Sequence, residues 1–401
     1  MDIGVTRTRG ATIALFAAVC LVAMNMRPTI TAVGPLLDEI GTDTGLAIAT
    51  LGLLASVPLA AWAIVSPFAH DLSQRFGMSR VVLWSLLLLT LGTAVRSLPG
   101  PTASLWIGTV LIGVALAIAN VLMPAVVKRD FGGRVPLVMA LYTGLLGGFG
   151  AIASGVAVPV SQIPLGGEPA GWRFSLLVTG GVLLLPAIVV WGWATRGRGH
   201  GSGRSRSHGR TGIWSDPVAW IVAAYMGLQS ASFYMQVTWL ATISTSTGRS
   251  SIAAGVDVMI YQIAAVGGAL ALPFALRGRV EALAPALLPI LGIVGLSGLI
   301  VAPSGITGWV ILTGLCSGAS LGMSLTLMAQ RARDHDGASA LSGMSQSVGY
   351  VVAAIGPPVF GWLHAITAGW LAPLVLLMAV LIGQGIVGIF AGRERFVLEP
   401  R

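Results

Sequence analysis

The chain contains 401 residues, of which 55% are hydrophobic and only 9% are charged. Soluble proteins carry about 25% charged residues, so lipid rather than water is the expected surrounding of most of this chain. The net charge of +9 does not indicate a nucleic-acid partner, because the basic residues are spread through short loops, and neither the two cysteines nor any cluster of ligands predicts a metal or another cofactor.

Runs of about 20 apolar residues, the length that crosses a bilayer, recur along the chain. We therefore predict an all-α membrane protein with twelve transmembrane helices. In chain order the expected spans are 11–36, 46–69, 80–97, 103–127, 136–162, 172–195, 216–245, 252–276, 284–302, 308–329, 338–365 and 369–391. The first run lacks a clear cleavage site and is longer than the apolar part of a signal peptide, so we interpret it as the first span.

The first span carries Arg27 next to Pro28, deep inside the apolar run. A charge at such depth costs on the order of 2.5–3.5 kcal/mol and almost always faces the bundle interior or a wet cavity. One interpretation is a fixed ion pair with Asp257, the one carboxylate well inside a span. The other is that Arg27 faces a central cavity and binds the negative charge of the substrate, while Asp257 occupies Arg27 when substrate is absent. Pro28 is expected to bend the helix.

Arginines gather in alternate loops, and the positive-inside rule then places both termini in the cytoplasm. We therefore predict a multi-pass protein of the inner (plasma) membrane. The opposite loops are expected to hold few arginines together with several acidic residues: Arg96, Arg173, Arg249, Asp38, Glu39, Asp43 and Glu168.

The longest polar stretch, RGRGHGSGRSRSHGRTG at 196–212, is rich in Gly, Ser and Arg. Such a composition cannot bury apolar surface, so a flexible cytoplasmic linker is expected. It divides the chain into an N-terminal six-helix half (1–195), a basic linker (196–215) and a C-terminal six-helix half (216–401).

The two halves show weak internal similarity. MRPTITA (26–32) aligns with MQVTWLA (235–241), and GVALAIANVLM (113–123) aligns with GASLGMSLTLM (318–328), at nearly the same offset. Two such matches indicate a duplicated six-helix unit, an arrangement in which substrate binds near the membrane midplane between the repeats. Gln236 aligns with Arg27, so we expect it opposite Arg27 at a similar depth.

Further polar and aromatic side chains inside the spans are candidates for the same site. For each of them the alternative is a packed residue whose polar group bonds a neighbouring helix. With Arg27 and Gln236, the candidate substrate-binding residues are Asn25, Asn120, Tyr142, Trp239, Tyr261, Gln262, Gln346 and Tyr350, and Asp257 is the candidate for coupling transport to protons.

Several blocks carry a resemblance to a known family. The loop HDLSQRFGMSR (70–80) looks like a degenerate form of the major facilitator motif G-x-L-A-D-R-x-G-R-R, with Gln74 in place of its aspartate. More specifically, the chain resembles the cyanate/2-nitroimidazole permease branch of that superfamily in blocks from both halves. These are MRPTITAVGPLLDEI (26–40), ANVLMPAVVKRDF (119–131), LQSASFYMQVTWLATI (228–243) and LSGMSQSVGYVVAAIGPPVFGWLHAIT (341–367). The resemblance implies a twelve-helix carrier that moves small solutes, often anions, by alternating access.

We therefore expect a transporter of a small anion such as cyanate, nitrite or a carboxylate, with Arg27 as the anion anchor, working as a monomer in the lipid bilayer. The alternative is an exporter of drugs or nitroimidazole-like heteroaromatics. An enzyme is not expected, because the sequence lacks HExxH, a placed GxSxG and clustered metal ligands. It also lacks the ATP-binding loop GxxxxGK[ST], which argues against primary active transport.

Overall fold

The computed structural model describes residues 9–196, 212–275, 281–333 and 335–398. Almost all of them are helical, as predicted, and the one sheet is a two-stranded hairpin, β1 (Pro164–Leu165) with β2 (Glu168–Pro169). Most of the predicted linker 196–215 lies outside the described residues.

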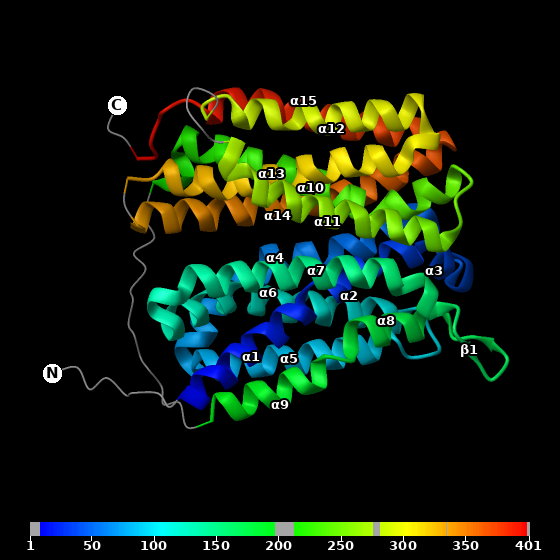
Figure 1. Ribbon diagram of the computed structural model, residues 1–401, viewed down its shortest axis with the longest axis horizontal. Helices are drawn as coiled ribbons and strands as arrows, with labels where there is room; N and C mark the ends of the chain where they lie inside the picture. Colours follow the sequence, from blue (N-terminus) through cyan, green and yellow to red (C-terminus); the bar gives the residue numbers. More distant parts are fainter. Residues whose placement is uncertain (1–8, 197–211, 276–280, 334, 399–401) are drawn as a thin grey trace.

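The helices form two bundles of successive segments (Figure 1). The first bundle contains α1 (Arg9–Met26), α2 (Pro28–Thr31), the short 3-10 helix η1 (Gly34–Leu36), α3 (Leu37–Thr44), α4 (Ile48–Phe76), α5 (Met78–Arg96), α6 (Ala103–Phe131), η2 (Gly132–Arg134), α7 (Val135–Ser161), α8 (Gly171–Gly181) and α9 (Leu184–Ala194). The second contains η3 (Ile213–Ser215), α10 (Pro217–Ser246), α11 (Ser251–Ala275), α12 (Ala284–Val301), η5 (Pro303–Gly305), α13 (Ile306–Gln330), α14 (His335–Thr367) and α15 (Leu371–Ala391).

Eleven helical segments of the described chain are long and apolar enough to cross a membrane. The one predicted span outside this set is the seventh, 216–245, which corresponds to α10; this helix has 30 residues but is less apolar. Its serines, threonines and glutamines are mostly buried against other helices, so they need not meet lipid. The predicted count of twelve therefore fits the structure, with α10 as the most protein-enclosed helix.

Two predicted spans are interrupted. The first, 11–36, is broken between α1 and α2, and the sixth, 172–195, is broken between α8 and α9. The prediction that Arg96 lies in an outer loop is wrong: it is the last residue of α5 and is only 2% exposed. The distribution of charges predicted that Arg96 lies at the C-terminal end of its span, which the structure shows. It could not show that the side chain is buried in the bundle.

The halves meet mainly through three pairs of elements: α4 with α14, α7 with α11, and η1 with α10. In Figure 1 these contacts lie along the middle of the molecule, with α12 and α15 on the outer side of one half and α5 and α9 on the outer side of the other. We call the end that holds α3 and the β1–β2 hairpin the α3 end. The start of α1 and the end of α15 lie at the opposite, terminal end.

Near the α3 end the halves touch backbone to backbone. A Cβ atom added at Gly34 would lie 2.4 Å from the carbonyl oxygen of Val237, and one at Gly52 would lie 2.6 Å from that of Pro357. We call these two contacts the glycine seam. Real Cβ atoms do not approach oxygen so closely, so each site needs a residue without a side chain. Farther toward the terminal end, a Cβ at Gly144 of α7 would meet nothing within 4 Å.

Candidate functional site

The site begins at the break in the first span. Helix α1 ends at Met26, and Pro28 opens α2 without an N–H to donate backward. Arg27 lies between the two helices, half-buried, and its carbonyl accepts from the amides of Ile30 and Thr31, each at 3.0 Å. The side chain therefore leaves the backbone from a kink rather than from a continuous helix.

Aromatic rings surround the Arg27 guanidinium. Its Cζ lies 5.2 Å from the ring centroid of Phe233 on α10, a cation–π contact that joins the two halves. Three nearby tyrosines interact electrostatically with the Arg27 charge: Tyr142, Tyr234 and Tyr350. Within the described part of the chain, no carboxylate forms an ion pair with Arg27.

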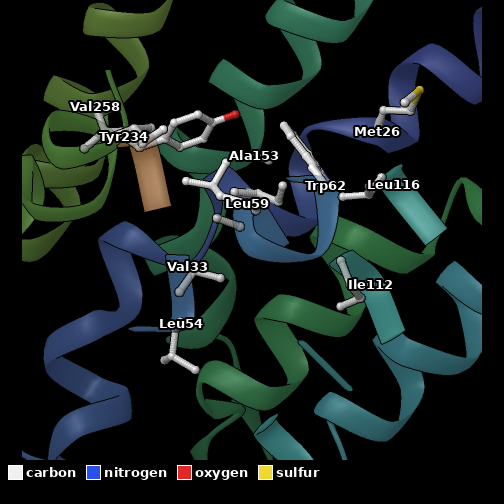
Figure 2. Packing of buried hydrophobic residues seen from close by; sticks show 14 of the residues in the cluster. Met26, Val33, Leu54, Leu59, Trp62, Ile112, Leu116, Ala153, Tyr234 and Val258 are labelled. Atoms are coloured by element: carbon white, nitrogen blue, oxygen red, sulfur yellow. The ribbon is translucent and has the colours of Figure 1, made fainter. Parts of the chain in front are cut away.

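Trp62 of α4 extends this aromatic wall. Its ring packs edge-on against Tyr350 at 5.1 Å and against Tyr234 at 6.4 Å between centroids. Figure 2 shows Trp62 and Tyr234 together with Met26, which directly precedes Arg27. The hydroxyl of Tyr142 lies 2.8 Å from the sulfur of Met26, so α7 also contacts the broken span here.

Hydrogen bonds from α7 and α11 hold the other side of the break. Gln262 Nε2 donates to Ser154 Oγ at 2.7 Å and to the carbonyl of Gly150 at 3.4 Å. Ser154 Oγ in turn donates to the carbonyl of Thr31 at 2.9 Å. A Cβ on Gly150 would lie 2.9 Å from Arg27 Cβ and 3.2 Å from Gln262 Oε1. The structure thus brings together Arg27, Tyr142, Gln262 and Tyr350 among the predicted residues; with Phe233, Tyr234 and Trp62 they form what we call the Arg27 site.

The predicted pairing of Asp257 with Arg27 is corrected. Asp257 is fully buried on α11 and pairs with Arg249, whose Nε lies 2.8 Å from Oδ2. It also accepts hydrogen bonds from the hydroxyls of Ser244 at 2.6 Å and Thr307 at 3.0 Å. All of these partners belong to the C-terminal half, so Asp257 faces its own bundle and leaves Arg27 without a carboxylate.

Replacing Asp257 with alanine should therefore destabilise the protein. The change leaves Arg249 and two hydroxyls without their acceptor, at a cost of roughly 1–3 kcal/mol, reduced from the buried-pair value because Arg249 can turn toward solvent. Thermal unfolding in detergent should show a midpoint several degrees lower. The matched control is Arg173→Met, which removes an exposed ion pair with Asp43 but leaves Asp43 as the acceptor for Trp172 Nε1, and should cost about 0–1 kcal/mol. Equal midpoints for the two variants would contradict this assignment.

Gln236 and Trp239 lie on α10 but not in the Arg27 site. Gln236 Nε2 donates to Ser232 at 3.3 Å, and the side chain lines a small cavity enclosed by helices of the C-terminal half. This corrects the expected position opposite Arg27. Trp239 Nε1 donates to the carbonyl of Pro357 at 2.9 Å, which ties α10 to α14.

Three other predicted residues make contacts elsewhere, and no contact with the Arg27 site is shown for a fourth, Asn120, within the described residues. Asn25 Nδ2 donates to the carbonyls of Leu21 and Leu183, at 2.7 and 3.1 Å, and so faces α9. Gln346 Nε2 donates to Ser342 Oγ, within α14, at 2.9 Å. Tyr261 is buried behind Phe233, with 5.9 Å between the rings, and Asn120 is half-buried in α6.

A cavity of about 360 Å³ opens between the halves at the α3 end. Its lining includes Asp38, Glu39, Ser161 and Thr245, and the hydroxyl of Thr245 donates to Asp38 at 3.3 Å across the two halves. This vestibule is acidic, whereas the Arg27 site is basic. An anion approaching from this end would meet unfavourable charge first.

Comparison with known proteins assigns the family. Residues 13–357 match the sequence model of the Major Facilitator Superfamily. The chain belongs to the major facilitator superfamily. As members of this family do, it transports a small solute across a membrane and is not an enzyme.

Three relatives show to which branch of the superfamily this facilitator belongs. It is 37% identical to an uncharacterized transporter, YycB, of Bacillus subtilis (strain 168) over 96% of this chain and 95% of that one. It is 36% identical to the 2-nitroimidazole transporter of Escherichia coli (strain K12), over 96% of each chain. Identity to the cyanate transport protein CynX of the same organism is 27% over 94% of this chain and 96% of that one. The predicted branch is thereby confirmed.

Solved structures agree on the fold. A bacterial homologue of the lysosomal transporter Spinster, in an inward-facing and occupied conformation, superimposes with a TM-score of 0.75 at 14% identity, over 96% of this facilitator and 95% of that chain. The inward-open xylose transporter XylE of E. coli gives 0.73 at 10% identity, over 95% and 94%.

Proposed function

We propose that this facilitator binds a small, planar solute with delocalised negative charge or a strongly polarised group at the Arg27 site and carries it by alternating access. The observation that supports this most is the Arg27 guanidinium itself. It lies at the contact between the halves, faces aromatic rings, and has no carboxylate partner among the described residues. A half-buried charge at the contact between the halves is stabilised by a counter-charge, which a solute would supply.

The shape of the site supports a flat solute. Phe233, Tyr234, Tyr350 and Trp62 offer ring faces and edges, and aromatic walls with a few polar groups are usual for small-molecule sites. Arginine offers a planar fork of donors that suits two oxygens of one group. A nitro group and a carboxylate both present such a pair of oxygens. Nitroimidazoles therefore fit this site as well as small anions do.

Direction and topology are also proposals. The acidic vestibule at the α3 end disfavours anion entry from that side, which supports the exporter as a second candidate. We place the α3 end outside the cell and both termini in the cytoplasm of a monomer in the inner membrane, as the arginine distribution indicates. Asp257 stays a candidate for coupling, although its ion pair with Arg249 also accounts for its burial.

The test is counterflow into proteoliposomes with the purified wild-type protein. Radiolabelled 2-nitroimidazole, cyanate, nitrite and acetate would each be compared with lactate and glucose as larger, non-planar controls. We expect saturable exchange with at least one of the flat solutes and none with glucose. Exchange that is faster when substrate starts on the terminal side would favour export. Equal exchange of all solutes, or of none, would contradict the proposal.

A further inference from the structure

Arg96 is a second arginine deep in the N-terminal half, and its surroundings are unusual. It is 2% exposed and lies at the end of α5. Within the described residues it forms no ion pair, and its Nε and Nη2 atoms are buried without a hydrogen-bond partner. Its one hydrogen bond to the described residues runs from Nη1 to the carbonyl of Thr29 at 2.7 Å. Burying a guanidinium with so few partners costs free energy of folding, so we expect the bond to Thr29 to serve a function.

The acceptor of this bond belongs to the broken span. In a continuous helix the carbonyl of Thr29 would accept from the amide of Val33, but that amide donates to Ile30 instead, at 3.3 Å. The tightened backbone at the end of α2 therefore leaves the Thr29 carbonyl without a backbone donor inside the membrane-spanning bundle. A free carbonyl there needs a donor, and the charged guanidinium is a strong one.

The broken segment is held from two sides. Arg96 of α5 binds Thr29 on one side, while on the other Ser154 of α7 donates to the carbonyl of Thr31, and Thr31 Oγ1 donates to Gly150 at 2.8 Å. Arg27 directly precedes this clamped segment. Movement of the segment would move the Arg27 side chain away from the aromatic rings.

Arg96 is itself fixed in place by a close contact with α6. A Cβ added at Gly108 would lie 2.4 Å from the backbone nitrogen of Arg96, so the two helices touch through a glycine at this level. A Cβ added at Gly180 of α8 would lie 2.8 Å from the methyl group of Thr29, so Thr29 is also closely packed. These contacts fix the backbone around Arg96 and Thr29. The Arg96 guanidinium therefore stays within reach of the Thr29 carbonyl.

We propose that Arg96 is a positioning residue of the transport site: it holds α2 at Thr29 so that Arg27 faces the aromatic rings. The inference rests on the proposed function, because it takes Arg27 as the group that binds the solute. Arg96 does not touch the solute. It adds a second positive charge near the site, which also favours a negatively polarised ligand.

The experiment compares three replacements of Arg96 in the purified full-length protein. Arg96→Lys keeps a charge and a donor, Arg96→Gln keeps a donor alone, and Arg96→Met keeps neither. For the flat solute that exchanges in the wild type, Kd would be measured by equilibrium binding and the unfolding midpoint by a thermal scan. The control is Arg173→Met, which removes an arginine of α8 that pairs with Asp43 of α3.

We expect Arg96→Met to weaken binding about tenfold or more, Arg96→Gln to weaken it less, and Arg96→Lys to stay within about threefold of wild type. A merely structural role would lower the midpoint without this order in Kd. If Arg96→Met does not purify, the Gln and Lys variants decide by the same order. Unchanged Kd in Arg96→Gln and Arg96→Met overturns the inference, and so does an equal loss in all three.

Failure of the inference differs from failure of the proposed function. If Arg27→Met loses binding while all Arg96 variants keep it, only the positioning role is wrong. If Arg27→Met binds the solute as wild type does, Arg27 is not the binding group and the proposed function itself is wrong.

Discussion

Replacing Arg27 with methionine should reduce solute binding and counterflow at least about 100-fold, since a charge-assisted, two-point contact in a low-dielectric site is lost. Methionine keeps an unbranched apolar stem of similar width, so the rings of Phe233 and Tyr350 should stay packed. The unfolding midpoint should stay or rise, because a half-buried charge without a carboxylate partner is removed. A loss of binding together with retained stability is the combination that identifies a ligand-binding charge.

Two further variants sharpen this result. Arg27→Lys restores the charge without the planar fork and should recover binding only in part, with a Kd about tenfold above wild type. Arg129→Met removes an exposed arginine paired with Asp130 and should bind as wild type does. Normal binding by Arg27→Met would rule out the anchor, and full recovery by lysine would rule out recognition by a two-oxygen group.

Replacing Gly34 with valine should stop transport by preventing closure at the α3 end. The new Cβ would lie 2.4 Å from the carbonyl oxygen of Val237, a backbone atom that cannot move aside without its helix. The halves must then stay apart at the glycine seam. We expect counterflow to fall at least about tenfold, while equilibrium binding falls far less, because the variant excludes a conformation rather than a contact.

Cysteine labelling can report this conformation directly. Ala241 lines the cavity at the α3 end and is 3% exposed, so a cysteine there should react slowly with a maleimide in wild type and faster in Gly34→Val. The native cysteines would be replaced by serine in both. The matched control is Gly144→Val, since a Cβ at Gly144 meets nothing within 4 Å. Equal labelling and normal counterflow in Gly34→Val would contradict the closing role of the seam.

Hydropathy and charge in the sequence were sufficient to predict the helices, the two halves and the exceptional position of Arg27. These properties depend on transfer from water to lipid, which acts residue by residue. A bend in the first span was predicted from Pro28, which lacks a backbone N–H, and the structure shows a full break between α1 and α2 at this point. The carrier family followed from motifs rather than from physics.

The partners of the interior residues could not be predicted in the same way. Gln236 occupies the repeat position of Arg27, but α10 has Val237 where the first span has Pro28, so its helix continues without a break and the side chain turns elsewhere. Asp257 was placed at the right depth, yet depth does not say which face of α11 it occupies. Phe233 and Trp62 were missed because an aromatic residue in an apolar run carries no local sign of what it faces.

The kink at Arg27 has a consequence for how the chain enters the membrane. The carbonyls of Thr29 and Thr31 are satisfied by Arg96 and Ser154, which lie on α5 and α7 and are synthesised later. When the first segment leaves the ribosome, neither donor exists, and Arg27 has no ring beside it. The first helix should thus insert weakly on its own. It should become a stable transmembrane segment only once α7, the fifth span, has been inserted. Insertion of this carrier is in that sense cooperative over the first 161 of its 401 residues, up to the end of α7.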